Sequence, residues 1–353
     1  MSDDLVTAAL TREHRRLFDY DRRRLGDEFA MYEPCPGCGS TSSKHEFSKD
    51  WFNFDRCREC GMVWTNPRLN DQTLADFYNG DYTKAYNATK FFAPGQQEVD
   101  AITTDARRFL SAAAPYQPSG RFLEVGAGGE GTMMAAALAA GYEVTAVEVT
   151  TECVAALRRR FGDSVTVIHA DIYDASLEPR SFNVIVMRDV LEHIPHPRRF
   201  LRALSQLAIE DAVLLVQVPN VDGLIYRLVR QRHTVIFGFE HVNYWTVSSL
   251  SRALSDAGFD VVDVEHQSVD FTLSTVHSYL FGRPTFTTVL PPPPQSPVWR
   301  ALGRITWPLV RLLRPLDHRL LPKLANRVRR GSVMTVVARR RADQPESQTP
   351  TAA

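Results

Sequence analysis

Short apolar runs alternate with helical patterns along the second half of the chain. The runs lie at 122–125, 143–149, 164–170, 182–187, 212–218, 260–265 and 332–338. Apolar positions with a helical period fall near 131–140, 151–161, 197–208 and 246–257. Short apolar strands that alternate with helices are typical of a mostly parallel sheet covered on both faces. We therefore predict an α/β fold with a Rossmann-like, seven-stranded sheet, and a ligand beyond the carboxyl ends of its strands.

Four of the five cysteines form two CxxC pairs, each followed by a glycine. The pairs are Cys35 with Cys38 and Cys57 with Cys60. Two such knuckles place four thiolates at the corners of a tetrahedron, which is how proteins hold structural Zn²⁺. Four cysteines close the coordination sphere, so we expect a structural metal rather than a catalytic one. Cys153 lies in a helical pattern and is predicted to be a small packing residue.

Composition changes divide the 353 residues into predicted segments. We expect a charged helical lead-in over 1–30, a small N-terminal zinc-ribbon module over 31–66 and a helical connector over 67–119. The α/β domain is predicted over 120–340, with an insertion at 268–330, and the polar tail at 341–353 is expected to be disordered. A module as small as 31–66 needs a metal because its own core is thin.

Charge and targeting signals limit the classes of protein. The 41 Lys and Arg balance the 41 Asp and Glu, which argues against a surface that is entirely a nucleic-acid footprint. No run of 18 apolar residues predicts a membrane span. The start at Met1 lacks a basic segment followed by an apolar one, so we expect no signal peptide, reduced thiols and a cytoplasmic location.

The insertion is strongly basic. Between Val298 and Arg330 the single acid is Asp317, and leucines interleave with arginines. Prolines at 308, 315 and 322 predict broken basic amphipathic helices, and the four prolines at 291–294 predict a stiff hinge. A solvated lid over the acceptor site is favoured, because the prolines deny the segment one long face. Contact with an anionic membrane or an acidic lipid-linked acceptor stays open.

A glycine-rich turn follows the first strand of the α/β domain. Gly126, Gly128 and Gly131 permit close approach of a ligand to the backbone, with Ala127 between the first two. The same glycines satisfy the dinucleotide pattern GxGxxG, so the turn alone does not identify the cofactor.

Residues at the ends of four strands favour S-adenosylmethionine as the cofactor. Glu124 would repel a pyrophosphate but attract an amino-acid ammonium group. Glu148, followed by Val149, is placed to accept both ribose hydroxyls. Asp171 suits the exocyclic amine of an adenine, and Ile172 would cover one ring face. Arg188 and Asp189 end the fourth strand and are expected to line the same site.

Together these stretches resemble a class I S-adenosylmethionine-dependent methyltransferase over about 121–340. The matching segments are LEVGAG at 123–128, EV at 148–149, HADI at 169–172 and VLEHIPHP at 190–197. The family usually places its third glycine where Glu130 stands, so the resemblance predicts a locally altered turn there.

A narrower resemblance is to the sugar C-methyltransferases, which carry a zinc module ahead of such a domain. Their Glu-His pair after the fifth strand corresponds to Glu240 and His241. The resemblance makes His241 the first candidate for a general base, oriented by Glu240, with His193 and His196 next. This chain has Gly238 where they have a tyrosine, and it is short of their usual C-terminal domain.

The predicted function is methyl transfer to a small hydroxylated acceptor, such as a sugar or glycosylated secondary metabolite, at oxygen or carbon. An RNA methyltransferase that uses the zinc module and the basic 300–330 stretch is the first alternative. A non-catalytic scaffold and a nicotinamide oxidoreductase are the others. The oligomeric state is left open.

Overall fold

A seven-stranded sheet lies at the centre of the computed structural model, which describes residues 2–90, 96–268, 271–282, 289–290 and 296–342. Its strands, in spatial order, are β10 (Thr166–His169), β9 (Glu143–Glu148), β8 (Arg121–Val125), β11 (Phe182–Arg188), β12 (Ala208–Pro219), β15 (Val333–Arg340) and β14 (Phe259–Gln267). The first five are parallel, and β15 runs antiparallel to both neighbours. The predicted Rossmann-like sheet is confirmed, because every predicted run forms a strand. The strand order reverses between β8 and β11, which is where such sheets bind ligands.

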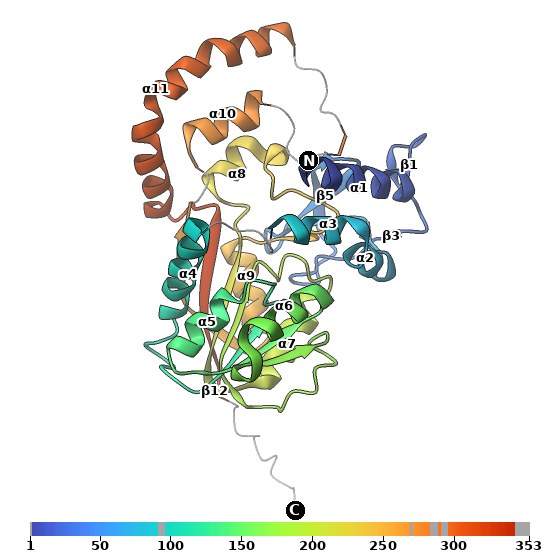
Figure 1. Cartoon of the computed structure of the whole chain (residues 1–353). Helices are drawn as coiled ribbons and strands as arrows, with labels where there is room; N and C mark the ends of the chain where they lie inside the picture. Colours follow the sequence, from blue (N-terminus) through green and yellow to red (C-terminus); the bar gives the residue numbers. More distant parts are fainter. Residues whose placement is uncertain (1, 91–95, 269–270, 283–288, 291–295, 343–353) are drawn as a thin grey trace, which may run out of the picture.

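Alternating residues of the buried strands pack on opposite faces of the sheet. In β12, Val213 and Leu215 belong to one core, and Leu214 belongs to the other. The first core includes residues of α4 (Gln96–Ser111), α5 (Thr132–Ala139) and α6 (Thr151–Phe161). The second includes residues of α7 (Pro197–Leu207) and α9 (Val247–Asp256). Helices therefore cover both faces, and Figure 1 shows them flanking the sheet.

The N-terminal region builds a second, antiparallel sheet with help from the α/β part of the chain. Its order is β13 (Asn243–Tyr244), β6 (Val63–Thr65), β5 (Phe52–Cys57) and β4 (Ser43–Lys49). Asn243 pairs with Trp64 and Tyr244 with Val63. The cysteine-bearing strands are thus joined by main-chain hydrogen bonds to the segment that directly follows Glu240 and His241.

One aromatic core unites these N-terminal strands with the loop before β13. The ring of Phe52 lies 5.0 Å from that of Phe239, in a T-shaped contact. Phe77 stacks on Phe239 at 5.3 Å, and Phe54 meets Tyr244 at 5.5 Å. Such pairs add about 0.5–1.5 kcal/mol each beyond their buried area. The N-terminal core is therefore not self-contained, because it is shared with residues some 180 positions later in the chain. A hydrogen bond joins the same two regions: Lys49 Nζ donates to the carbonyl of Ile236, 187 residues away.

Short elements complete the N-terminal half. They are α1 (Ser2–Leu17), β1 (Phe18–Asp19), β2 (Arg24–Leu25), β3 (Ala30–Met31), β7 (Arg68–Leu69), α2 (Asp71–Tyr78) and α3 (Asp81–Lys90). Asn70 caps α2, since its side chain accepts from the amide of Thr73 at 2.9 Å. The capped helix packs Phe77 into the aromatic core and presents Tyr78 to the sheet's ligand edge.

The basic insertion differs from its prediction. After α8 (Leu224–Val229) and α10 (Leu273–Phe281), residues Pro297–Arg327 form one continuous helix, α11. The predicted breaks at Pro308, Pro315 and Pro322 are wrong: the helix runs through all three, and Figure 1 shows it bending along its length instead. Proline removes one hydrogen bond and tilts a helix, which bends it without ending it.

Two further predictions concern residues outside the described part of the chain. The hinge at 291–294 and the tail from 343 onward lie there. Among the helices that are described, none combines the length and apolar character needed to cross a bilayer.

Candidate active site

A single cavity of about 1240 Å³ opens at the carboxyl ends of β8, β9 and β11. On one side it is lined by the glycine turn and by the ends of those strands. On the other side it is lined by α2, α3 and the loop that precedes β13. Pockets for one drug-sized ligand measure roughly 300–1,000 Å³. This cavity therefore has room for a cofactor and an acceptor side by side.

Three of the four glycines of the turn adopt backbone angles that favour glycine. Their φ values are 73° at Gly126, 61° at Gly128 and 60° at Gly131. A Cβ on Gly126 would lie 2.6 Å from Val190, and one on Gly131 would lie 2.5 Å from Phe161. Gly131 also forms the N-cap of α5. The third glycine is therefore Gly131 rather than residue 130, and its left-handed backbone leads directly into α5.

Glu148 holds the glycine turn from the end of the neighbouring strand. Its Oε2 accepts from the amide of Gly128 at 2.9 Å, and its Oε1 accepts from the amide of Thr150 at 2.8 Å. The carboxylate is buried but lines the cavity, while Val149 is 59% exposed at the cavity wall. A ribose beside the turn would meet the carboxylate, and an apolar ring would meet Val149.

Asp171 and Ile172 follow β10 at the same edge of the sheet. The Oδ1 atom of Asp171 accepts from the amide of Tyr173 at 3.0 Å, which orients the carboxylate. Ile172 is 8% exposed, and both residues line the cavity. The structure therefore places an acid next to an apolar surface, as the adenine prediction requires.

Glu124 is a buried carboxyl with an unusual protonation state. Burial raises its pKa to about 8, and the nearby Glu148 adds to the rise while Arg188 opposes it. Among the described residues its Oε2 has no hydrogen-bond partner. Such an oxygen facing a cavity suits a cationic ligand group, which would supply the missing partner.

Arg188 and Asp189 lie at the end of β11 and line the cavity. Arg188 pairs with Asp105 of α4 at 2.7 Å and lies over the ring of Phe109. Asp189 has a positive φ of 53°. A left-handed non-glycine residue is uncommon and often marks a functional site.

His193 and His241 meet at the other end of the cavity. Their ring centroids lie 4.6 Å apart, with the planes almost perpendicular. Nδ1 of His241 lies 2.8 Å from the carbonyl oxygen of Val235. A carbonyl only accepts, so this contact places the proton on Nδ1 and leaves Nε2 as the basic nitrogen. His196, the third candidate, instead contacts Asp71 at 3.1 Å.

Two tyrosines from the N-terminal helices complete this end, and sequence reasoning missed both. The hydroxyl of Tyr78 lies 2.9 Å from Nδ1 of His193 and donates to the carbonyl of Glu240 at 3.3 Å. The side chain of Tyr82 hydrogen-bonds that of Glu240, and burial raises the pKa of both phenols well above 10. No local pattern in α2 or α3 distinguishes these tyrosines from packing residues.

The packing around Gly238 explains why this chain lacks the tyrosine that the sugar C-methyltransferases have at this position. A Cβ at this position would lie 2.6 Å from the ring of Phe52, so no larger side chain fits without a shift. A phenol group reaches His193 from Tyr78 instead, and another reaches Glu240 from Tyr82.

Glu192 joins the motif after β11 to the loop that carries His241. Its carbonyl accepts from the amides of Val242 and Asn243, both at 3.0 Å. Its side chain is 2% exposed, and burial raises the pKa of the carboxyl well above its ordinary value. The two histidines are therefore held at a fixed separation by main-chain bonds.

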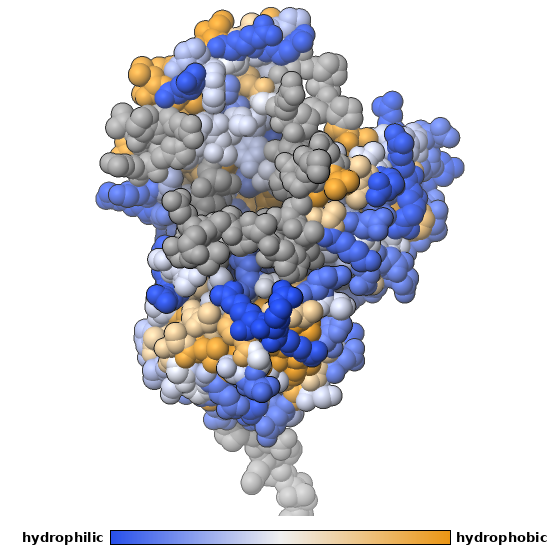
Figure 2. Space-filling model, in the orientation of Figure 1, coloured by the Kyte–Doolittle hydropathy of each residue, from blue (hydrophilic) through white to orange (hydrophobic). Residues whose placement is uncertain are grey.

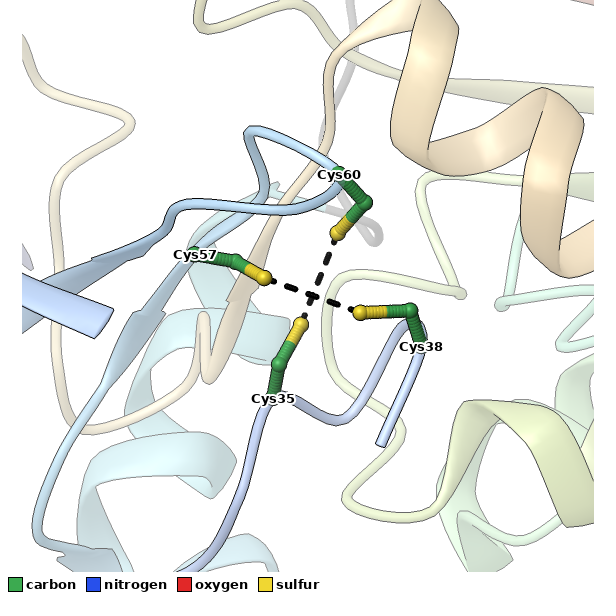
Figure 3. A group of neighbouring side chains, drawn as sticks. All are labelled: Cys35, Cys38, Cys57 and Cys60. Atoms are coloured by element: carbon green, nitrogen blue, oxygen red, sulfur yellow. Dashed lines mark hydrogen bonds between the residues drawn. The ribbon is translucent and has the colours of Figure 1, made fainter. Parts of the chain in front are cut away.

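The four predicted metal ligands converge at one point (Figure 3). The Sγ atoms of Cys35 and Cys60 are 3.6 Å apart, as are those of Cys38 and Cys57. A tetrahedral zinc site with bonds of about 2.3 Å requires sulfurs about 3.8 Å apart, whereas a disulfide requires about 2.05 Å. The sulfur positions fit Zn²⁺ and do not fit two disulfides.

Comparison with known proteins places this site in context. A family model described as a methyltransferase domain matches residues 98–264, which contain every residue of the glycine turn and of the His193–His241 pair. The match ends within β14, so α10, α11 and β15 lie beyond it.

Among curated proteins, the chain is 29% identical over 132 residues to a ubiquinone biosynthesis O-methyltransferase of Xanthomonas campestris pv. campestris. The match covers 36% of this chain and 55% of that protein. One from Neisseria meningitidis is 26% identical over 126 residues, with 32% and 53% covered. The chain thus spans about half the length of the curated relatives it matches.

Among solved structures, a Burkholderia thailandensis 1,6-didemethyltoxoflavin-N1-methyltransferase is 15% identical, with a TM-score of 0.47. The match covers 85% of this chain and 100% of that one. An Archaeoglobus fulgidus SAM-dependent methyltransferase is 18% identical, with a TM-score of 0.46, covering 73% and 100%.

Proposed function

We propose that this chain is a class I S-adenosylmethionine-dependent methyltransferase and that it methylates a small hydroxylated molecule such as a sugar or a glycosylated secondary metabolite. One observation carries the proposal. A single cavity of about 1240 Å³ joins the glycine turn, where the cofactor would bind, to the His193–His241 pair. A scaffold that had lost its activity would not need an open acceptor end beside two histidines.

In this proposal the cofactor lies along the carboxyl ends of the strands. Glu148 would exchange its bonds to the turn for the ribose hydroxyls, and Gly126, Ala127 and Gly128 would approach the cofactor with their backbone. Asp171 and Ile172 would hold the adenine. Glu124 would take the ammonium group of the methionine part, while Arg188 and Asp189 line its flank.

Methyl transfer is an in-line displacement in which the acceptor atom attacks the methyl carbon and the sulfonium leaves as a thioether. Positioning the two reactants contributes up to roughly 7–11 kcal/mol. An acceptor hydroxyl must also lose its proton. Nε2 of His241 is the first candidate to take it, and His193, held by Tyr78, is the second. A positioned base adds roughly 10²–10⁴ in rate.

The four cysteines would hold a structural Zn²⁺. Its role in the proposal is indirect: it fixes β5 and β6, and β6 pairs with β13 beside the Glu240–His241 loop. All four sites would be filled by cysteine, which leaves no open position for chemistry on the metal.

The choice of acceptor rests on the site's size and polarity. Phenols, imidazoles and a carboxylate at one end of a cavity of about 1240 Å³ suit a small polar molecule better than an RNA duplex. The curated relatives are named as O-methyltransferases, which supports transfer to oxygen. Carbon methylation, as in the sugar C-methyltransferases, is the second candidate because Glu240 and His241 occupy the matching loop.

The test combines cofactor binding with acceptor screening. Calorimetry should show one S-adenosylmethionine bound per chain, and Glu148→Ala should weaken binding by roughly 100-fold or more, because hydrogen bonds to a charged group contribute about 1.5–3 kcal/mol each. Glu143→Ala, at the exposed start of the same strand, is the matched control. Labelled cofactor should then modify a sugar nucleotide, glycoside or phenol. Labelling confined to RNA, or no cofactor binding by folded protein, contradicts the proposal.

A further inference from the structure

Helix α11 carries an apolar stripe that faces solvent. From Val298 to Leu312 its members recur every three or four residues, which places them on one side of the helix, and Leu320 and Leu324 extend the stripe eight residues further along. The stripe consists of Val298 (78% exposed), Leu302 (41%), Ile305 (74%), Leu309 (58%), Leu312 (74%), Leu320 (61%) and Leu324 (52%). Large apolar side chains scattered singly are ordinary, but a long exposed row of them marks an interaction surface.

The same helix is strongly basic. Exposed cations accompany the apolar stripe along the helix, and the single acid between 298 and 330 is Asp317. The exposed ones are Arg300, Arg304, Arg311, Lys323, Arg327 and Arg329. Figure 2 shows hydrophobic and hydrophilic residues adjoining each other at the top of the molecule, where Figure 1 places α11.

The continuity of α11 changes the interpretation of this segment. The sequence favours a lid, because its prolines predict a segment without one long apolar face. The structure has that long face, and it is turned away from the body: Gly303 is buried against Phe281 of α10, whereas Ile305 and Leu312 point outward. A lid would bury its apolar side over the acceptor.

Charge decides between two occupants of the stripe. A second copy of the chain would bring another α11 against this one, and the arginines of both helices would repel with no acids to pair them. A bilayer with anionic headgroups offers apolar chains to the stripe and negative charge to the arginines. Basic helices with an exposed apolar face and tryptophan, here Trp307 at 42% exposure, are typical of that environment.

We propose that α11 docks this protein on the surface of an anionic lipid bilayer, lying in the plane of the interface. The apolar stripe enters the headgroup boundary, and the exposed arginines of the same helix attract the phosphate groups. This is peripheral contact and not a membrane span.

The docking helix is connected to the acceptor end of the cavity. Trp299 Nε1 donates to the carbonyl of Leu280 at 3.1 Å, which ties α11 to α10. In α10, Tyr279 stacks on His233 at 5.1 Å, and its hydroxyl lies 2.9 Å from Oγ1 of Thr234. His233 and Thr234 line the cavity. A bilayer under α11 would therefore lie two helices away from the acceptor end.

The test is flotation of the full chain with lipid vesicles, in the absence of any methyl acceptor. Vesicles of phosphatidylcholine mixed with phosphatidylglycerol should carry the protein, and vesicles of phosphatidylcholine alone should not. High salt should release it, because screening removes the headgroup attraction. Arg304→Gln with Arg311→Gln should weaken partitioning by about 30-fold, given roughly 1 kcal/mol for each cation near the surface.

Single substitutions separate the stripe from the rest of the surface. Leu312→Glu, at a leucine that is 74% exposed, should weaken partitioning at least about tenfold. Leu5→Glu, at a leucine of α1 that is 66% exposed, should not. Arg159→Gln on α6 is the control for charge. Unchanged melting temperature and cofactor affinity show that each variant is folded.

Equal flotation with neutral vesicles, or none with either, overturns the proposal. So does a dimer in light scattering that Leu312→Glu converts to a monomer, since the stripe would then hold a second copy. None of these results depends on which acceptor is methylated.

Discussion

The phenol oxygen of Tyr78 lies 2.9 Å from Nδ1 of His193, although 115 residues separate them in the chain. Tyr78 is the last residue of α2, and it also donates to the carbonyl of Glu240 at 3.3 Å. When the hydroxyl donates to that carbonyl, its oxygen accepts from Nδ1–H of His193, which leaves Nε2 of that histidine basic. The N-terminal region thus sets the orientation of a group at the acceptor end.

Tyr78→Phe is expected to lower the rate of methyl transfer without changing cofactor affinity. Removing the hydroxyl frees the His193 ring to rotate and removes the bond that selects its tautomer. We expect kcat to fall roughly 10²-fold if His193 takes the acceptor proton, within the range for general base catalysis. The pH dependence of kcat should shift as well, because the histidine loses a partner.

Tyr142→Phe is the matched control for that experiment. Its hydroxyl donates to the Gln117 carbonyl at 2.5 Å, at the opposite end of the sheet. Both substitutions remove one phenol hydrogen bond, so equal losses of rate in the two variants would show that Tyr78 is merely structural.

The sequence predicted the sheet well because each of its strands is a local signal. Runs such as 182–187 and 212–218 are apolar throughout, as expected for strands buried on both faces. The gathering of the candidate cofactor residues at one edge was predictable for the same reason: Glu124, Glu148 and Asp171 lie at or just after the ends of parallel strands, and all three line the cavity.

The acceptor half was less accessible to sequence reasoning. Tyr78 and Tyr82 lie in short helices whose side chains reach the site only through the fold of the N-terminal region. The two-residue strand β13 is too short to carry a periodic signal, yet it links the cysteine module to His241. Proline propensity predicted breaks in α11, and the structure overrode that local preference.

Cofactor binding is expected to release a proton from Glu124. In the free protein the pKa of this carboxyl is about 8, so near pH 7 most molecules hold the proton. An ammonium group bound beside the carboxyl favours its ionised form and lowers the pKa. Calorimetry near pH 7 in buffers of different ionisation enthalpy should reveal release of close to one proton, declining as the pH rises past about 8.

Glu124→Gln should abolish that proton release, and Glu143→Gln, at 73% side-chain exposure, should leave it intact. The same raised pKa bears on stability. Between about 4.5 and about 8 the folded state binds more protons than the unfolded state, so the free protein loses stability as the pH rises through this window. The glutamine variant should flatten that decline in melting temperature. A binding enthalpy independent of the buffer contradicts this account.

Zinc removal is expected to disable methyl transfer more than cofactor binding. Cys57→Ser should abolish the tightly bound zinc found by elemental analysis, because one of four thiolates is lost. Strands β5 and β6 would loosen, and with them the pairing of β6 to β13 next to His241. The cofactor half, built on β8 to β10, should retain most of its affinity.

Cys153→Ser is the control for the zinc experiment. Cys153 is buried in α6, far along the chain from the knuckles, and belongs to no metal cluster among the described residues. It should keep one zinc per chain, and the metal content is the readout of this control because Cys153 itself lines the cofactor end of the cavity. Zinc retained in Cys57→Ser, or cofactor binding lost together with the metal, would contradict the division of roles.

Gly131→Ala and Gly141→Ala distinguish crowding from backbone strain at the two ends of α5. Both glycines have a positive φ, 60° and 87°, so alanine incurs a backbone cost of about 1–2 kcal/mol at either position. A Cβ at 131 would also lie 2.5 Å from Phe161 and 2.8 Å from Leu157, whereas at 141 it would meet open space. Crowding of that kind typically adds about 1–3 kcal/mol. Denaturant unfolding should therefore show about twice the destabilisation for Gly131→Ala.

Gly131→Ala alone should also bind S-adenosylmethionine more weakly, because α5 begins directly after Gly131. Equal behaviour of the two variants would mean that the turn tolerates a side chain at 131, and that the third glycine does not shape the cofactor site.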